Sequence, residues 1–540
     1  MLPPRSLSFM LSLALFSVAE AAVIQVPGDH GLIQDAINAS VDGDEVVIAP
    51  GEYFETDLDF GGRSITVRGS DPSDMDVVLN TIIDADSLGA VFHFQNAEGR
   101  TSTVSGLTIT GASGSWNEGG GVLCDNGARP TISSCVIWGN YGGGGIKSQG
   151  GAMPLVEACM VTANEHEAGV YAYAGSVHLL RTEVFANEDY GVYIRSMADA
   201  DTAIIEECDI SYNGDDGVYV FSYSNATLER SLIRGNHGEG VNINGHSSGI
   251  FRDCTMTGNH NSGVMIDSND EKGELYNCVL SGNGSSKYDA GLRLGNSTVL
   301  VEHCVFYDNY APSTNSGGPI YATQGSHTTV RNSILWGNEP AAIQKNGPDY
   351  LSVTFCDLES GEADGIGNFS SDPHFRAPES GDFHLMSAEC GDAYTSPAID
   401  RGRPSDFDAG SGCDLGLGTI RADLGLYGGA NAPCDLALAL SDAPARITRG
   451  ETLSYRVSLA NPCADVLSFD RVQIDYRGPA SASQPLTFDP AVALGGGDEV
   501  ESVLSIPVPT AAPTGDYTVT ASVELEGTAL SEDSFVVTVD

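Results

Sequence analysis

Positive charge is scarce in this chain of 540 residues. Only 25 residues are Lys or Arg, against 73 Asp and Glu, and the formal net charge at pH 7 is −48. A surface this acidic repels phosphate backbones and anionic lipid headgroups. The composition therefore excludes nucleic acid as a partner and argues against docking on a membrane surface.

Long apolar runs are also missing beyond the N-terminus, so we expect no transmembrane span. Residues 1–21 combine Arg5, an apolar run from Leu7 to Val18 and the small-residue ending Ala19-Glu20-Ala21. This pattern is typical of a cleaved signal peptide, the alternative being an N-terminal membrane anchor. We expect a secreted or cell-envelope protein, exposed at the surface and monomeric.

Internal repetition dominates the middle of the chain. A short apolar segment ending in Asn recurs nine times, 23 to 29 residues apart, with Asn at positions 140, 164, 187, 213, 236, 259, 283, 309 and 338. A tenth copy has Gly361 at that position. Asn and Gly most readily adopt a positive φ, so we expect a sharp backbone turn there. Stacked Asn side chains can also pass hydrogen bonds from one copy to the next.

A second segment follows each Asn and alternates apolar with polar or aromatic residues. Examples are GVYAYA (169–174), GVYIRS (191–196) and GVYVFS (217–222). A period of two predicts a strand with one buried face. One repeat cannot bury its own apolar face, so the copies are expected to stack.

Residues 23–367 resemble the right-handed parallel β-helix proteins of the pectin-lyase-like superfamily. Residues 24–55 are similar to the usual opening of these proteins, in which a short helix, here about 32–39, covers the end of the core. The resemblance implies an all-β solenoid over residues 22–367. It is specific for the fold and says little about function.

Two further units are expected after the solenoid. Residues 368–434 lose the repeat and resemble the closing segment that follows β-helices in many bacterial surface proteins. Residues 435–540 contain five alternating stretches separated by turn signals, which predict an immunoglobulin-like β-sandwich.

The twelve cysteines favour structure over chemistry. No C-x-x-C spacing occurs, and seven cysteines share one repeat position with Ser and Thr, which indicates a buried small side chain. Disulfides between Cys390 and Cys413 and between Cys434 and Cys463 would suit a secreted protein. Cys124 has no obvious partner.

The turn between the two repeated segments is acidic on successive copies. Counted back from the next Gly, one register holds Glu167, Asp189 and Asp215, and the next holds Asp216 and Glu239. Carboxylates stacked about 5 Å apart repel each other unless they bind a proton or a cation. Glu167, Asp189 and Asp215 are therefore candidate Ca²⁺ ligands.

The same column can also supply an acid and a base for glycosidic-bond cleavage. The candidate catalytic residues are Asp189, Asp216, His237 and Glu239. Asp215-Asp216 with His237-Gly238 resembles the acidic pair and Gly-His-Gly element of polygalacturonase-like hydrolases, but the order differs and no Arg-x-Lys motif follows. A solvated acidic turn without a ligand is the alternative.

Aromatic residues lie beside this turn. Tyr171, Tyr193 and Tyr219 share one outward register, and Arg195 follows two residues after Tyr193. Such a strip can bind sugar rings, and these four residues are the candidate ligand-binding set. Stacking that merely stabilises the sheet is the alternative.

The sequence thus predicts a secreted β-helix that binds an extracellular polysaccharide. Processing of the bound polysaccharide is the enzymatic form of the same hypothesis. A polysaccharide lyase, a glycoside hydrolase or a uronate epimerase acting at the acidic turn is the enzymatic alternative. A structural surface protein or adhesin without a small ligand is the other.

Overall fold

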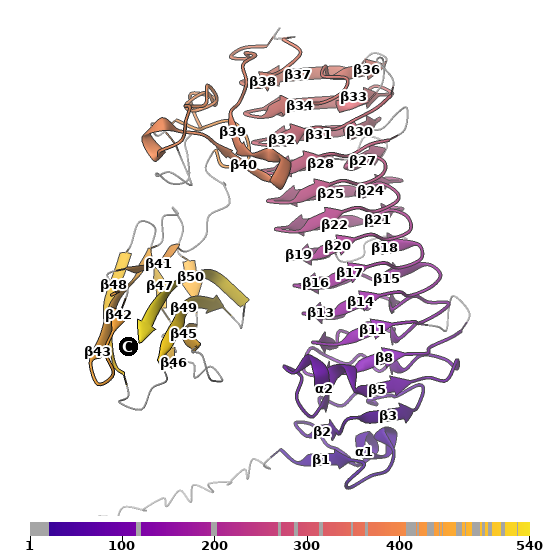
Figure 1. Ribbon diagram of the computed structural model, residues 1–540. Coiled ribbons are helices and arrows are strands. Elements are labelled where there is room, and N and C mark those ends of the chain that lie inside the picture. Colours follow the sequence, from indigo (N-terminus) through magenta and orange to yellow (C-terminus); the bar gives the residue numbers. More distant parts are fainter. Residues whose placement is uncertain are drawn as a thin grey trace, which may run out of the picture.

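We describe the protein from a computed structural model (Figure 1). The structure describes residues 21–406, apart from 115–119, 196–201, 268–271, 286–289, 313–316, 347–348 and 362–364. Beyond these it describes 417, 421–428 and most of the strands between 437 and 539. The expected signal peptide therefore lies almost entirely outside the described residues.

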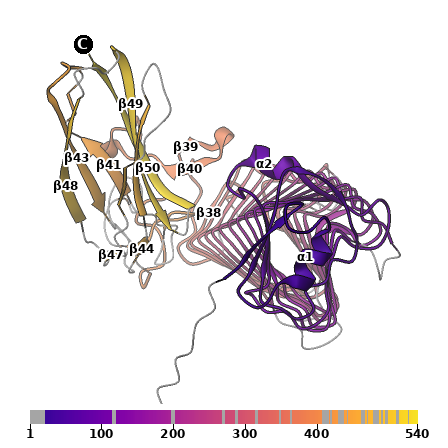
Figure 2. The same cartoon turned by 90° about the horizontal axis from the view of Figure 1, so that it is seen from below.

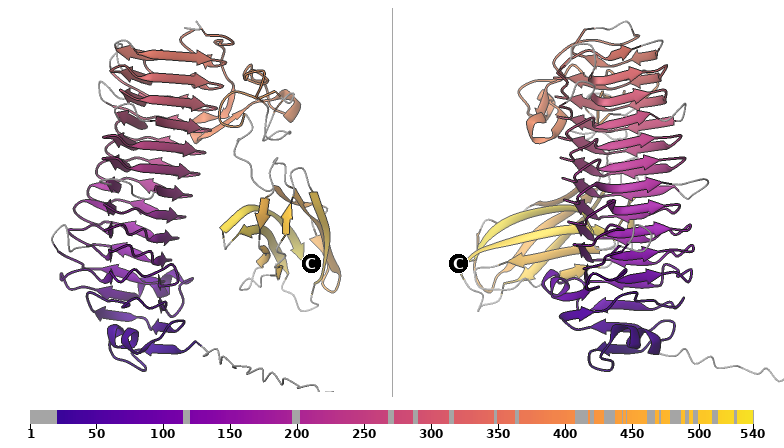
Figure 3. Two further views of the ribbon diagram at one scale, coloured as in Figure 1. Left: turned by 180° about the vertical axis from the view of Figure 1, so that it is seen from behind. Right: turned by 90° about the vertical axis from the view of Figure 1, so that its right-hand side faces the viewer.

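Residues 23–358 form a column of stacked coils whose strands line up in three parallel sheets (Figures 1 and 3). Sheet 1 has 14 strands. Its members are β1 (Val23–Val26), β2 (Glu45–Ile48), β4 (Thr66–Gly69), β7 (Thr103–Ser105), β10 (Thr131–Ser133), β13 (Leu155–Glu157), β16 (His178–Leu180), β19 (Ala203–Glu206), β22 (Asn225–Glu229), β25 (Ser248–Arg252), β28 (Lys272–Tyr276), β31 (Thr298–Glu302), β34 (His327–Arg331) and β37 (Tyr350–Thr354).

Sheet 2 contains the repeated segments that end in Asn and has 13 strands. They are β3 (Gly51–Phe54), β5 (Thr81–Asp84), β8 (Thr108–Thr110), β11 (Val136–Trp138), β14 (Met160–Thr162), β17 (Glu183–Phe185), β20 (Asp209–Ser211), β23 (Leu232–Arg234), β26 (Thr255–Thr257), β29 (Val279–Ser281), β32 (Val305–Tyr307), β35 (Ile334–Trp336) and β38 (Asp357–Leu358).

Sheet 3 contains the second repeated segments and has 11 strands. They are β6 (Phe92–Phe94), β9 (Val122–Cys124), β12 (Ile146–Gln149), β15 (Ala168–Tyr173), β18 (Tyr190–Arg195), β21 (Val218–Phe221), β24 (Val241–Asn244), β27 (Val264–Asp267), β30 (Ala290–Gly295), β33 (Gly318–Thr323) and β36 (Gln344–Asn346). The period of two in the sequence therefore marks a real strand on each coil.

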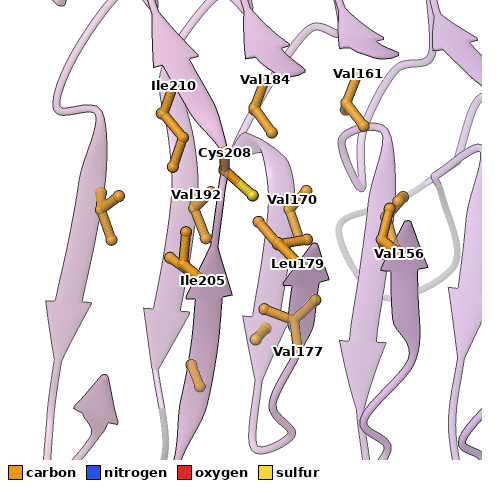
Figure 4. Close-up of a cluster of buried hydrophobic side chains, with 14 of the residues drawn as sticks. Val156, Val161, Val170, Val177, Leu179, Val184, Val192, Ile205, Cys208 and Ile210 are labelled. Carbon is orange, nitrogen blue, oxygen red and sulfur yellow. The ribbon is translucent and has the colours of Figure 1, made fainter. Parts of the chain in front are cut away.

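The three sheets enclose one continuous apolar core. On one coil Val192, Ile205 and Ile210 come from sheets 3, 1 and 2, and all three are fully buried (Figure 4). The same positions on neighbouring coils are filled by other branched residues, so the core repeats along the column. Burial of this stripe is the main stabilising contribution to a stacked fold.

Helix α1 (Ile33–Ala39) lies at the N-terminal end of the column (Figure 2). Ile33, Ala36 and Ile37 are fully buried and belong to the core cluster of the sheets. The Glu55 carboxylate accepts the Ile33 and Gln34 N–H groups at 2.6 and 3.0 Å, which satisfies two free donors of the first turn. The helix expected at about 32–39 is present. A second helix, α2 (Met75–Leu79), precedes β5.

The repeated asparagines form a hydrogen-bonded ladder, and their expected backbone conformation was wrong. Eight amide–amide hydrogen bonds of 2.9 to 3.0 Å join the nine residues, one bond per coil, from Asn140 to Asn338. None of the nine has a positive φ; the residue before each one does, with φ of 50° to 70°. The turn is therefore made by the preceding residue, which is Gly in five copies. The asparagine is selected by its side chain.

The repeat cysteines are buried thiols. Eight cysteines of the described chain are free, namely 124, 135, 159, 208, 254, 278, 304 and 356. Burial raises the pKa of Cys254 and Cys278 well above the usual thiol value, so these side chains stay uncharged and unreactive. Cys390 is disulfide-bonded. Cys413, Cys434 and Cys463 lie outside the described residues, so the two expected pairings stay predictions.

The segment after the solenoid packs on the outer face of sheet 2. Strands β39 (Phe375–Ala377) and β40 (Asp382–Leu385) form an antiparallel pair. Phe375, Phe383 and Leu424 join Val305 and Ile334 in a second apolar cluster. The loss of the repeat after 367 thus coincides with a change from coiling to side-on packing.

Asp357 lies at the end of this covered face, and we expect it to make stability depend on pH. Its side chain is fully buried and in register with Ile334, and its Oδ1 accepts the Ser371 N–H at 3.0 Å. Burial raises the pKa of Asp357 to about 7, opposed by that hydrogen bond and reinforced by the Asp372 carboxylate.

Between about pH 4 and pH 7 the folded chain therefore holds a proton that the unfolded chain has released. The free energy of unfolding should fall as pH rises through this window. Thermal unfolding midpoints of wild type and Asp357→Asn across it should diverge, with the variant the more stable at pH 8. Parallel curves for the two proteins would contradict the assignment.

The C-terminal strands run from 437 to 539 in three small sheets, ordered β41-β43-β48, β42-β50-β49-β45-β46 and β44-β47. All their pairings are antiparallel except β42 with β50. The strands are β41 (Ala437–Ser441), β42 (Arg446–Ile447), β43 (Thr452–Ala460), β44 (Leu467–Phe469), β45 (Arg471–Arg477), β46 (Leu486–Phe488), β47 (Val492–Leu494), β48 (Glu499–Pro507), β49 (Gly515–Leu525) and β50 (Thr528–Val539).

Candidate functional site

The candidate residues lie on the outer face of sheet 3 and on the turns that lead into its strands. Parallel pairing places Lys147, Tyr171, Tyr193, Tyr219 and Asn242 in one outward column, one residue per coil. Val170, Val192 and Val218 precede the three tyrosines and point into the core, because successive side chains of a strand alternate. The sequence period thus fixes which side chains meet outside.

The tyrosine rings stack on one another along the column. Ring centroids are 5.1 Å apart for both Tyr171–Tyr193 and Tyr193–Tyr219, with interplanar angles of 29° and 16°. At that distance near-parallel rings cover part of each other's faces. The stack therefore presents ring edges and hydroxyls to solvent, and it does not form a flat open platform.

Exposure differs along the stack. Tyr171 is only 4 % exposed, so a ligand cannot lie on its ring as the sequence led us to expect. Tyr193 and Tyr219 are partly exposed. The next residue in the column is Asn242, so no aromatic ring of this column continues the stack beyond Tyr219. The accessible part of the strip is its Tyr193–Tyr219 end.

The two cations nearest to the rings are already engaged. Lys147 is fully buried, with its Nζ 5.3 Å from the centroid of the Tyr171 ring. The Arg195 guanidinium lies between Tyr173 and Phe221, 5.5 and 5.7 Å from their centroids. Both contacts have the geometry of cation–π interactions, which hold the two side chains in the wall of the site.

Asp216 and Glu239 form a carboxyl pair at the end of the stack. Asp216 is 3 % exposed; its Oδ1 accepts the Glu239 N–H at 2.7 Å, and its Oδ2 accepts the Asn242 amide at 2.9 Å. Burial raises the pKa of Asp216 to about 8, and the side-chain hydrogen bond with Glu239 and the charge of Glu239 add to this. Asp216 is therefore protonated near neutral pH.

Asp215 and Tyr190 extend the pair towards the rings. Tyr190 stacks on Tyr219 with centroids 5.3 Å apart. Its hydroxyl is hydrogen-bonded to the Asp215 side chain. Burial raises the pKa of Asp215, the Tyr190 hydrogen bond lowers it, and the charges of Glu239 and Asp189 raise it further, so that the net shift is upward. Acidic and aromatic groups thus form one connected surface.

Gly238 lets the backbone approach this pair closely. A Cβ at this position would overlap the Asp216 carboxylate and lie 2.7 Å from Asp215 Oδ1. Any larger residue would push the carboxyl groups apart, so the glycine is part of the site's construction.

The comparisons with known proteins decide the family. The profile described as "Right handed beta helix region" matches residues 61–200, 96–236 and 196–358, which together cover more than half of the chain. The chain belongs to the right-handed β-helix family. A search of curated proteins finds no match.

This β-helix protein is similar in fold to solved structures at low identity. The periplasmic alginate epimerase AlgG is 11 % identical, with 61 % of this chain and 82 % of that chain covered and a TM-score of 0.42. The A-module of the Azotobacter vinelandii mannuronan C-5 epimerase AlgE6 is 14 % identical, with 64 % and 95 % covered and a TM-score of 0.40. A CARDB domain from Pyrococcus furiosus is 22 % identical over 19 % of this chain and 94 % of its own, with a TM-score of 0.16.

The β-helix brings most of the expected site residues together, with some differences in role. Asp216, Glu239, Asp215, Tyr193 and Tyr219 lie in one connected surface. Asp189 lies one coil before Asp215, and Glu167 lies two coils before it. The Asp189 Oδ2 accepts the Glu167 N–H at 3.2 Å. The His237 side chain is exposed, on the turn before Gly238.

Three residues of the site were missed from the sequence. Tyr190 was not among the expected site residues; it pairs with Ala168 as the first residue of β18. Asn242 and Lys147 occupy the tyrosine register on the next and the preceding coil. The shared register is the signal that relates both to the tyrosines.

A cluster of potential metal ligands lies outside the acidic turn. Among the described residues, the cluster of three potential ligands within 4.8 Å is Glu302, His303 and Asp406, away from the acidic turn. Glu302 already pairs with Arg331 at 2.6 and 2.8 Å, and Asp406 with Arg403 at 2.9 Å. The two carboxylate charges of this cluster are therefore balanced by arginines without a metal ion. Ca²⁺ at Glu167, Asp189 and Asp215 stays a prediction.

No helix in the described part of the chain combines the length and the apolar character needed to cross a membrane.

Proposed function

We propose that this protein binds an extracellular polysaccharide on the strip formed by Tyr193, Tyr219 and Tyr190, with the Asp216–Glu239 pair as its chemical centre. The observation that carries the proposal is the position of that pair. A buried carboxyl group with a pKa of about 8 adjoins the accessible end of an aromatic stack. Perturbed carboxyl groups next to an accessible surface are typical of functional sites.

The strip has the features that sugar recognition needs. Tyrosine hydroxyls, carboxylates and the Arg195 guanidinium offer hydrogen bonds to sugar hydroxyls, and the partly exposed ring edges of Tyr193 and Tyr219 offer apolar contact to a sugar ring. The parallel coils repeat these groups about every 5 Å along the column. An extended polymer can therefore contact several coils at once.

The carboxyl pair favours one-sided proton transfer over hydrolysis. Glycoside hydrolases place two carboxyl groups about 5 Å or more apart, across the bond they cleave. Asp216 and Glu239 are instead hydrogen-bonded to each other, and Asp216 also accepts the Glu239 N–H at 2.7 Å. Such a pair can take or give one proton on one side of a bound sugar. If the protein is an enzyme, a lyase or an epimerase fits this geometry better than a hydrolase.

The remaining expectations complete the proposal. We infer a secreted or envelope-associated monomer in which α1 covers the N-terminal end of the core. Residues 435–540 serve as an immunoglobulin-like spacer or attachment module. The strand pairings of 437–539 support the β-sandwich assignment. The disulfide at Cys390 supports secretion or location in the cell envelope.

The replacement Tyr219→Ala tests the binding site. It removes the last ring of the stack and should weaken binding of responsive glycans by about tenfold, the effect of losing one stacking contact. Isothermal titration against a panel of polysaccharides measures this. Tyr212→Ala is the matched control, because Tyr212 is 60 % exposed and lies on a different turn.

The structural-protein alternative gives the opposite result. The mutual stacking of the tyrosines also stabilises the sheet. If no glycan binds, stabilising the sheet is the only role of the stack. Equal glycan affinity of the wild type and Tyr219→Ala, together with a lower melting temperature of the variant, would favour that alternative.

A further inference from the structure

The exposed edge of the tyrosine stack lies in a negative electrostatic field. Burial raises the pKa of Tyr219 to about 12, with further contributions from Tyr193, Asp216 and Asp215. Burial and then the Glu167 charge raise the pKa of Tyr171 in the same direction. Carboxylates therefore act on the rings at both ends of the stack.

The Arg195 charge opposes this field at Tyr171 and Tyr219, but the pKa of both tyrosines is raised despite it. Lys147 has no exposed surface, and Arg195 is held between two rings and hydrogen-bonded to Tyr193. Glu167, Asp189, Asp215 and Glu239 border the same strip, beside Asp216, which is protonated at neutral pH. A ligand on it meets an excess of negative charge.

The hydrogen-bonding groups of the strip also favour a ligand that carries donors. Ionised carboxylates only accept hydrogen bonds. The Asn242 Oδ1, beside the carboxyl pair, has no hydrogen-bond donor among the described residues, although its amide nitrogen donates to Asp216. Acceptors thus outnumber donors around the end of the stack, and a well-matched ligand must supply donors.

We propose that the strip selects a polysaccharide built from amino sugars whose amines are free and protonated. This inference rests on the proposed function and specifies its substrate class. A protonated amine supplies three donors and one positive charge, and it forms charge-assisted hydrogen bonds with Asp215 and Glu239 while the sugar ring contacts the partly exposed edge of Tyr219. N-acetylation removes the charge and two of the donors from an otherwise identical ring.

Anionic sugars fit the strip poorly. A uronate polymer would place one carboxylate per sugar against the carboxylates on the protein, and like charges in partly desolvated positions repel strongly. The sugar class that suits the tyrosines and also balances the carboxyl groups is therefore cationic.

A matched pair of ligands tests the proposal. Isothermal titration of the full chain at low ionic strength compares a glucosamine hexamer with an N-acetylglucosamine hexamer of the same linkage. We expect the free amine form to bind at least tenfold more tightly, and added salt to reduce the difference. The Asp215→Asn and Asp189→Asn variants should each lose several-fold of this preference.

The control variant removes one charge from another face. Glu183 is exposed on β17 in sheet 2, so Glu183→Gln changes the net charge equally and should leave the preference intact. A similar loss in this variant would show a general effect of net charge and would overturn the assignment to the strip.

The outcomes separate this inference from the proposed function. Equal or tighter binding of the acetylated hexamer, or of a uronate hexamer without divalent cations, overturns the amino-sugar assignment and leaves polysaccharide binding standing. A lysine hexamer that binds as tightly as the glucosamine hexamer overturns the selection for a sugar. Absence of binding by every glycan overturns the proposed function itself.

Discussion

Replacing Asn236 by leucine is expected to lower the free energy of unfolding by about 3–5 kcal/mol, the largest stability effect that we predict for a single side chain. Asn236 is 1 % exposed in the middle of the ladder. Its Nδ2 donates to Asn259 Oδ1 at 3.0 Å and to the Ile210 carbonyl at 3.1 Å. Its Oδ1 accepts the Asn213 N–H and the Asn213 amide, both at 3.0 Å.

Leucine at this position removes all four hydrogen bonds at once. The backbone N–H of Asn213 then loses its acceptor, the Asn213 amide keeps only its bond to the Val184 carbonyl, and the Ile210 carbonyl loses a donor. A buried polar group left without a partner costs about 1–3 kcal/mol. Leucine is similar in size to asparagine, so a cavity does not explain the loss. The backbone turn contributes little, because the positive φ belongs to Gly235.

Denaturant and thermal unfolding of the full chain measure the effect. Asn225→Leu is the control, since Asn225 is exposed on β22 and its midpoint should change by far less. If Asn236→Leu and Asn225→Leu have the same midpoint, the ladder does not stabilise the fold. A second test is Gly235→Ala, which strains the turn and separates the backbone contribution from that of the ladder.

The fold was accessible from the sequence because it repeats. Each coil must place an apolar residue of each strand into the core and must turn sharply between strands. The same sequence pattern therefore occurs in nine copies, and the repeat can be recognised from the sequence alone. The role of the asparagine could not be resolved in that way. A positive φ and a side-chain ladder both favour Asn, and only the coordinates show that the preceding residue makes the turn.

The site was predicted in outline, and its details depend on packing between coils. The shared register of the tyrosines follows from the period of two, but register does not determine ring orientation or exposure. Tyr171 is buried and the rings cover each other, because stacking neighbours compete with solvent for the ring faces. The contact of Asn242 with Asp216 joins residues 26 positions apart, and no local pattern predicts it.

The Asp216→Asn replacement should have the largest effect on function. If the Asp216–Glu239 pair transfers a proton, the variant should lose turnover by a factor of about 10²–10⁴, the usual contribution of a general acid or base. The shape of the site should survive, because an amide oxygen can still accept the Glu239 N–H. The Asn242 amide can rotate so that its unpartnered oxygen accepts a hydrogen bond from the new amide nitrogen.

The same variant gives an independent readout of the buried carboxyl. Burial raises the pKa of Asp216 to about 8, so the folded chain binds a proton that the unfolded chain has lost between about pH 4 and pH 8. The stability of the wild type should decline over this range, and Asp216→Asn should be the more stable protein above it. Glu183→Gln serves again as the control with an exposed carboxylate.

Turnover is followed on the glycans that bind, by ultraviolet absorbance of unsaturated products, by reducing ends and by proton exchange into the sugar. In the wild type, any activity found should change with a group that titrates near pH 8, and this dependence should vanish in the variant. Glycan binding should stay within a few-fold of the wild type, since the tyrosines are unaltered. A variant that binds glycans normally and turns them over at the wild-type rate would remove Asp216 from the chemistry and leave the strip as a binding surface.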